Sequence, residues 1–151
     1  MLDIEISFGV VEKTTGSIQD RIDLLLYDIK NQTLKFVEAK HYSNKEIWST
    51  KTPEVIGQIE KYEKQISENR ADIITAYENY IQAINTIFNK TLPLPLKVED
   101  KVALLIFGFD DDQKKGRLQK LILNNPAYKG CQIYCKQDKI NPASLWNSKV
   151  L

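Results

Sequence analysis

The stretch RIDLLLYDIKNQTLKFVEAK, residues 21–40, decides the fold that we expect for this chain. Strand-forming residues run from Ile18 to Ile29 and again from Leu34 to Lys40. The polar segment Lys30–Thr33 between them suits a hairpin loop. Because successive side chains of a strand point to opposite faces, every second residue of each run faces the same way. The stretch therefore predicts two antiparallel strands whose charged side chains gather on one face.

Three charged residues of this hairpin carry the functional prediction. Glu38 and Lys40 share a face of the second strand. A two-residue loop at Lys30-Asn31 would pair Asp23 with Glu38, and a four-residue loop would pair Asp23 with Lys40. A three-residue loop would pair Asp23 with Ala39 and turn its side chain to the wrong face. Directly opposed Cβ atoms lie about 5 Å apart, so both of the first two registers bring two carboxylates and an ammonium group together.

Such a cluster suits a divalent metal ion. Two close carboxylates repel each other unless a cation lies between them, and Mg²⁺ prefers oxygen ligands. Asp23 and Glu38 are the expected ligands, with the backbone carbonyl of Ala39 as a further one. A bound Mg²⁺ or Mn²⁺ ion polarises a phosphoryl oxygen and lowers the pKa of a bound water. Lys40 would orient that water or stabilise the negative charge that develops on the phosphate.

The remaining sequence predicts helices packed on a sheet. Thr52-Pro53-Glu54 has the features of a helix start, with Thr52 as the N-cap and Pro53 at the first helical position. Apolar residues then recur at helical spacing as far as Phe88, either in one long helix or in two that meet near Ser67–Asn69. We also expect strands at Ile4–Val11, Lys101–Phe109 and Gly130–Lys136, a helix at Gln113–Leu123, and a short turn or helix at Pro142–Trp146.

At this point the sequence resembles a known superfamily. Ile22-Asp23, a hairpin, and Glu38-Ala39-Lys40 are similar to the PD-(D/E)xK nuclease motif, with Ile22 in place of the usual Pro. Gln58 and Tyr62, one helical turn apart, resemble the QxxxY motif of its RecB-like branch. The resemblance implies an α/β fold of the restriction-endonuclease-like type, a mixed central β-sheet flanked by α-helices. It also implies a Mg²⁺- or Mn²⁺-dependent deoxyribonuclease, acting on DNA in DNA processing or phage defence. The implied active-site residues are Asp23, Glu38, Lys40, Gln58 and Tyr62.

The N-terminus departs from the family pattern. Many relatives carry an acidic metal ligand on a helix before the first strand, whereas this chain begins almost directly with a strand. Glu5 and Glu12 are the nearest acids, and neither matches a motif. We therefore expect residues 1–151 to form a single nuclease-like domain that lacks this helix or was cut from a longer chain. Many relatives dimerise, so a homodimer or a larger protein context is also open.

Two rival functions remain open, and the missing helix motivates the first of them. The first is a catalytically inactive nuclease-like module that binds nucleic acid or a protein partner. The second is a structural domain in which the charged cluster is an ordinary solvated cross-strand group, contributing only tenths of a kcal/mol.

Several residues around the motif have both a functional and a structural interpretation. Lysines near the predicted strand and helix would contact phosphates, although exposed lysines are common on any surface. Tyr42 and Trp48 would stack on bases or pack in the core. These candidate nucleic-acid contacts are Lys45, Lys51, Lys61 and Lys64.

Other reactive residues are expected to be structural. Cys131 and Cys135 would lie about 13 Å apart on one strand, too far for a disulfide. His41 alternates to the face opposite Lys40, and a helix N-terminus accounts for the acids of Asp110–Asp112.

Composition limits the class of protein. Apolar residues make up 42% and charged residues 27% of the chain, as in a soluble globular protein. The net charge of +1 requires a nucleic-acid binder to sort its charges locally. The longest apolar run is far below the roughly 20 residues of a membrane helix. Without a visible secretory signal we expect a cytoplasmic location and no membrane partner.

Overall fold

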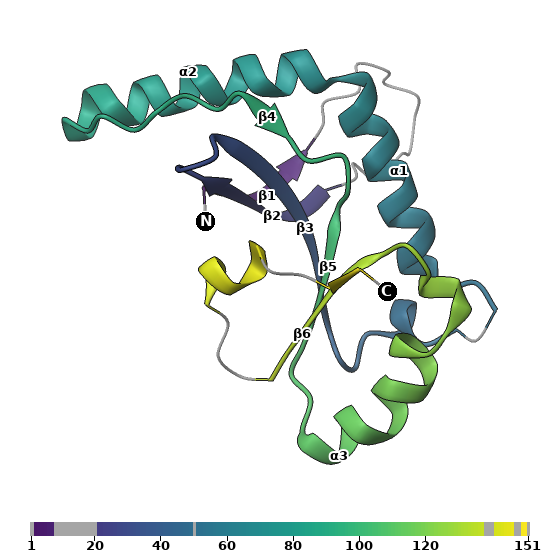
Figure 1. Cartoon of the computed structure of the whole chain (residues 1–151). Helices are drawn as coiled ribbons and strands as arrows, with labels where there is room; N and C mark the ends of the chain where they lie inside the picture. The colour runs from purple at the N-terminus through teal and green to yellow at the C-terminus, as the bar shows by residue number, and fades with distance from the viewer. Residues whose placement is uncertain (1, 8–20, 50, 138–140, 147–148, 151) are drawn as a thin grey trace.

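The computed structural model describes residues 2–7, 21–49, 51–137, 141–146 and 149–150. The described strands form a seven-stranded mixed sheet in the order β1-β2-β3-β5-β6-β7, with β4 paired to β3 outside this path (Figure 1). The parallel pairs are β3–β5, β3–β4 and β5–β6, and the other pairs are antiparallel. The strands are β1 (Asp3–Ser7), β2 (Arg21–Asp28), β3 (Thr33–His41), β4 (Lys97–Val98), β5 (Ala103–Phe107), β6 (Gln132–Lys136) and β7 (Lys149–Val150).

The hairpin of β2 and β3 has one of the two productive registers. Leu24 pairs with Val37, and continuing the same register places Asp23 opposite Glu38. The alternative that paired Asp23 with Lys40 is therefore wrong. The parts of the expected first two strands at residues 8–11 and 18–20 lie outside the described residues.

The turn of this hairpin explains its register. The last paired residues are Asp28 and Thr33, so four residues rather than two leave the ladder. The Asp28 carboxylate accepts hydrogen bonds from the backbone N–H groups of Lys30 (3.0 Å) and Asn31 (3.2 Å). These bonds replace strand pairing at the hairpin tip, as expected for an Asp that starts a turn.

Two helices follow β3, and the chain bends between them. They are α1 (Glu54–Glu68) and α2 (Arg70–Phe88), separated at Asn69, so of the two alternatives left open by the sequence the structure has two helices. Pro53 occupies the N-cap position and makes no side-chain cap bond, so the prediction of Thr52 as N-cap is wrong by one residue. Within the described part of the chain, no helix has the length and apolar character that crossing a bilayer requires.

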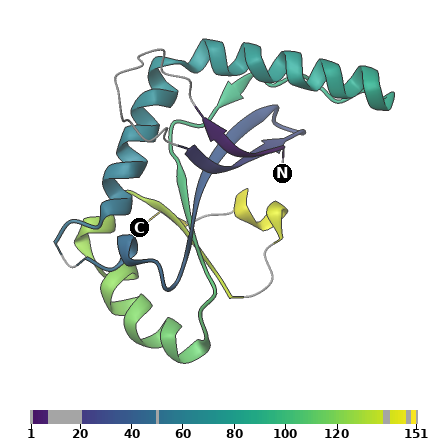
Figure 2. The same ribbon diagram turned by 180° about the vertical axis from the view of Figure 1, so that it is seen from behind.

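The helices and the short C-terminal turn cover opposite faces of the sheet. α1 and the segment of α3 (Asp111–Gln113) and η2 (Lys114–Leu123) lie on one side, and η4 (Pro142–Trp146) lies on the other (Figures 1 and 2). Alternation along β3 separates the two cores, because Phe36 packs toward the helices while Val37 packs toward Leu145. The α1 residues in the larger core are Val55, Ile59, Tyr62 and Ile66.

The central strands are parallel because helical segments connect them. β3 leads through α1 and α2 to β5, and β5 leads through α3 and η2 to β6. Residues Ala103 to Ile106 of β5 are buried, which confirms the prediction of a strand covered on both faces. The following helix starts at Asp111 with Asp110 as its cap, and its backbone bonds over η2 are of the π type.

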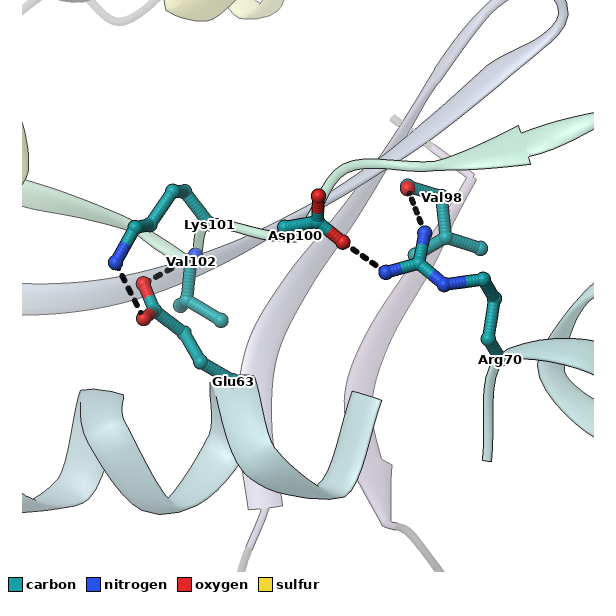
Figure 3. A network of polar contacts seen from close by, with 6 residues as sticks. All are labelled: Glu63, Arg70, Val98, Asp100, Lys101 and Val102. Carbon is teal, nitrogen blue, oxygen red and sulfur yellow. Dashed lines mark hydrogen bonds and ion pairs between the residues drawn. The ribbon is translucent and has the colours of Figure 1, made fainter. Parts of the chain in front are cut away.

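A polar network fixes the C-terminal half of α1 against the segment that leads into β5. Glu63 accepts hydrogen bonds from Lys101 Nζ at 2.8 Å and from the Val102 N–H at 3.2 Å (Figure 3). Across the bend, Arg70 donates to the Val98 carbonyl at 2.7 Å and pairs with Asp100. Because β5 pairs with β3, this network sets the position of α1 over the face that carries Glu38.

Candidate functional site

The candidate site lies where β2 and β3 stop pairing. Beyond the Leu24–Val37 pair, Asp23 Oδ2 accepts a hydrogen bond of 2.7 Å from the Ala39 N–H. The carboxylate thus takes the place of a backbone acceptor in the ladder. The N–H and C=O groups of one strand residue point to the same side, so the Ala39 carbonyl also faces the β2 side of β3.

Glu38 carries a buried carboxyl group, and one of its two oxygens has no hydrogen-bond partner among the described residues. Only 3% of the residue is exposed. Its Oε1 lies 2.8 Å from Lys40 Nζ, whereas its buried Oε2 has no hydrogen-bond partner among the described residues. Burial raises the pKa of Glu38 to about 7; the hydrogen bond from Lys40 opposes this, and the negative charge of Asp23 adds to it. A buried acceptor without a donor is rare enough to require an explanation.

Lys40 is held by a second acid that the sequence analysis did not identify. Its Nζ lies 2.5 Å from Glu46 Oε2, in addition to the 2.8 Å contact with Glu38 Oε1. Burial acts against the charge of Lys40, but its hydrogen bonds to Glu38 and Glu46 outweigh burial and raise the pKa of Lys40. The ammonium group therefore stays charged over the whole neutral range.

Glu46 belongs to η1 (Lys45–Ile47), a single turn after β3. Asn44 starts the turn by accepting the Glu46 N–H at 2.8 Å. The buried Tyr128 hydroxyl donates to the Ile47 carbonyl at 2.8 Å and so anchors the turn from the far end of the chain. The Asn44 cap is a weak sequence signal for the turn, but no local pattern indicates that it reaches Lys40.

The two residues of the QxxxY pattern have different surroundings. The hydroxyl of buried Tyr62 donates to the Arg21 carbonyl at 2.9 Å, at the start of β2 and two residues before Asp23. Tyr62 therefore helps to position the start of β2, the strand that carries Asp23. Gln58 lies one turn earlier on α1, and its Oε1 is buried without a hydrogen-bond partner among the described residues.

The donor set fits a hard divalent ion with few protein ligands. Asp23 and Glu38 supply carboxylates, and Glu38 Oε2 is buried with no hydrogen-bond partner in the described part of the chain. Within the described residues, no group of three or more His, Cys, Asp or Glu side chains has the geometry of a metal site. Mg²⁺ commonly binds through one or two carboxylates and keeps several waters. The residues present therefore fit Mg²⁺ or Mn²⁺ better than a metal that needs a closed protein cage.

The acids considered as extra ligands do not join the cluster. Glu5 is exposed, has a positive φ of 53°, and pairs with Arg21 at 3.3 Å. Glu12 lies outside the described residues. Glu46 is the additional acid that the fold brings to the site.

The candidate phosphate-binding lysines are dispersed. Lys45, Lys51, Lys61 and Lys64 are all exposed, and Lys64 forms a loose ion pair of 3.8 Å with Glu68. Lys45 also lines a surface hollow.

The residues expected to be structural are placed accordingly. Cys131 and Cys135 are free and partly packed against the larger core. His41 is exposed, and its ring lies edge-on to Phe107. Asp110 accepts the Gln113 N–H at 2.7 Å as a helix cap, which is a structural role.

Comparison of the chain with protein-family models, with curated proteins and with solved structures finds no match.

Proposed function

We propose that this protein is a Mg²⁺- or Mn²⁺-dependent nuclease of the PD-(D/E)xK type that hydrolyses phosphodiester bonds in DNA. One observation carries the proposal. The register of β2 and β3 places Asp23 opposite Glu38, while the Asp23 carboxylate binds the Ala39 N–H and the Glu38 carboxylate contacts the Lys40 ammonium group. This is the arrangement that the resemblance of the sequence to that motif requires. The deeper burial and unpartnered oxygen of Glu38 add support, because an ordinary surface charge pair has neither.

Each residue has a distinct role in the proposed reaction. Asp23, Glu38 and the Ala39 carbonyl would hold the metal ion, which supplies Lewis acidity and a more acidic water when bound. Water attacks the phosphorus atom, the bond from phosphorus to the leaving oxygen breaks, and the products are a phosphate monoester and a hydroxyl group. Lys40, kept charged by its two acids, would donate to phosphate oxygens as negative charge builds up.

The α1 residues would support this centre. The unpartnered Gln58 Oε1 is suited to accept a hydrogen bond from a water or from substrate. Tyr62 would hold Asp23 in place through its bond to the Arg21 carbonyl. Its effect on rate would therefore be smaller than that of either carboxylate.

The test is cleavage of single- and double-stranded DNA with Mg²⁺ or Mn²⁺ by wild type and by Asp23→Asn. Asparagine keeps an oxygen for the Ala39 N–H and removes the charge, so the fold should survive. Losing a residue that only orients a metal ligand costs about 10–100-fold in activity, so losing the ligand Asp23 itself should cost at least about a hundredfold. Asp72→Asn, on the exposed face of α2, is the matched control. Equal cleavage by wild type and Asp23→Asn would refute the proposal, and Asp23→Ala should be as inactive as Asp23→Asn.

A second function is favoured by a different observation. The positive charge of Lys40 is balanced by its ion pairs with Glu38 and Glu46. The described residues supply only two carboxylates for a metal. A nuclease-like module that binds nucleic acid or a protein partner without cutting would have these features. Binding of DNA that persists in EDTA, together with no cleavage in either metal, would favour this second function.

A further inference from the structure

A surface hollow lies between the segment after β3 and the helix formed by α3 and η2. Its volume is about 640 Å³, in the range of sites that enclose part of a small ligand. Among the described residues that line it none is acidic, and two are cationic. The lining residues are Tyr42, Ser43, Lys45, Trp48, Ser49, Gln113 and Arg117.

A planar cation and an aromatic ring are stacked in this hollow. The guanidinium carbon of Arg117 lies 4.1 Å from the centre of the Trp48 ring. Trp48 is itself fixed, because its Nε1 donates to the Tyr42 carbonyl at 2.7 Å and the Tyr42 ring lies edge-on at 4.7 Å. Arg117 is exposed, and no described carboxylate pairs with it. The stack therefore presents a rigid, positively charged plane to solvent.

The hollow borders the candidate active site. Lys45 is the first residue of η1, the turn in which Glu46 binds Lys40, and Trp48 follows that turn directly. Tyr42 is the first residue after β3, two residues beyond Lys40. The net charge of +1 leaves little general attraction for nucleic acid, so a local cationic plane of this kind decides where a strand binds.

We propose that this hollow binds single-stranded nucleic acid, with a base stacked on the Arg117–Trp48 plane and a neighbouring phosphate held by Arg117 and Lys45. Guanidinium planes and aromatic rings both stack on bases, and any base can supply the opposing face. In a duplex the base faces are covered by their neighbours, so the stacked plane selects for a single strand. The inference rests on the proposed function for the use of the strand, but binding itself requires no cleavage.

The experiment measures binding of a fluorescein-labelled oligothymidylate of 12 nucleotides to the full chain in EDTA, where no cleavage competes. Arg117→Gln should weaken binding about tenfold, because a stacked base and a phosphate contact are both lost. Arg117→Lys keeps the charge and loses the planar group. Its binding should therefore show the salt dependence of wild type, but its affinity should stay below that of wild type. Lys45→Gln should lower the slope of log K against log salt by about 0.7, the value for one phosphate contact on a single strand. Lys120→Gln removes a charge from the same helix outside the hollow and is the control.

Each alternative result overturns the inference. These results are no binding by wild type, equal loss in Arg117→Gln and Lys120→Gln, a preference for duplex, or competition by an abasic 12-mer as strong as by oligothymidylate. Cleavage with Mg²⁺ is measured separately. Cleavage that survives together with unchanged binding in Arg117→Gln would refute this inference and leave the proposed function standing. Binding that depends on Arg117, together with no cleavage in either metal, would support this inference and refute the proposed function.

Discussion

Replacing Glu38 by glutamine should change how the stability of the metal-free protein depends on pH. The substitution keeps the shape of the side chain and an oxygen for Lys40, and removes the group whose ionisation burial opposes. The amide nitrogen introduced near Asp23 also changes the free energy of unfolding by a fixed amount of either sign. That contribution does not vary with pH, so the pH profile isolates the ionisation of Glu38.

The magnitude follows from two pKa values. In the unfolded chain Glu38 titrates near 4.5, and in the folded protein near 7. Between these values the folded state holds a proton that the unfolded chain has lost, so the free energy of unfolding falls as pH rises through this window. Below the window both states are protonated and the penalty vanishes. Above it the penalty is complete and amounts to roughly 3 kcal/mol, most of it accumulating between about pH 5 and pH 8.

The assay is urea unfolding in EDTA at several pH values across this range, followed by circular dichroism. Wild type should lose about 2–3 kcal/mol relative to Glu38→Gln between pH 5 and pH 8, with the same dependence on urea concentration. Glu60→Gln, on the exposed face of α1, is the matched control and should follow wild type.

Parallel pH profiles for wild type and Glu38→Gln would refute the reasoning. They would mean that Lys40 compensates the buried charge completely, and that Glu38 ionises in the folded protein as easily as in water. A profile in which Glu38→Gln loses more stability than wild type at high pH would also refute the reasoning, because it would mean that the pKa of Glu38 is lower in the folded protein than in the unfolded chain.

Three further predictions test the site and its support. Excess Mg²⁺ or Mn²⁺ should stabilise wild type by about 2.7 kcal/mol at a hundred times its Kd and leave Glu38→Ala unchanged in thermal unfolding; equal shifts in both would place the ion elsewhere. Tyr62→Phe removes the 2.9 Å bond to the Arg21 carbonyl and should cost about 1 kcal/mol in urea unfolding, and an unchanged midpoint would contradict this role. Gly108 has a φ of 74° and a Cβ there would overlap the His41 ring, so Gly108→Ala should cost at least about 1 kcal/mol. Combining it with His41→Ala should recover the part due to overlap, whereas strictly additive losses would contradict that contact.

The sequence alone determined the features that depend on backbone periodicity. Alternation in a strand places Glu38 and Lys40 on one face whatever surrounds them, and helical spacing selects Tyr62 for the buried side of α1. The apolar run around Leu104 and Ile106 indicates a strand covered on both sides because no polar face is available. These properties follow from local geometry, so they could be predicted without knowing which segments meet.

The tertiary structure decided the features that depend on long-range contacts. The choice between two hairpin registers rests on the hydrogen bonds of Asp28 at the turn, which alternation does not specify. Glu46 reaches Lys40 because Tyr128, 81 residues away from Ile47, anchors its turn. Arg117 likewise comes from η2, far along the chain from Trp48, and its contact with the Trp48 ring forms only in the folded protein. The segment after β3 has no periodic pattern, so its side chains find their partners only through packing, and no reading of the sequence assigns those partners in advance.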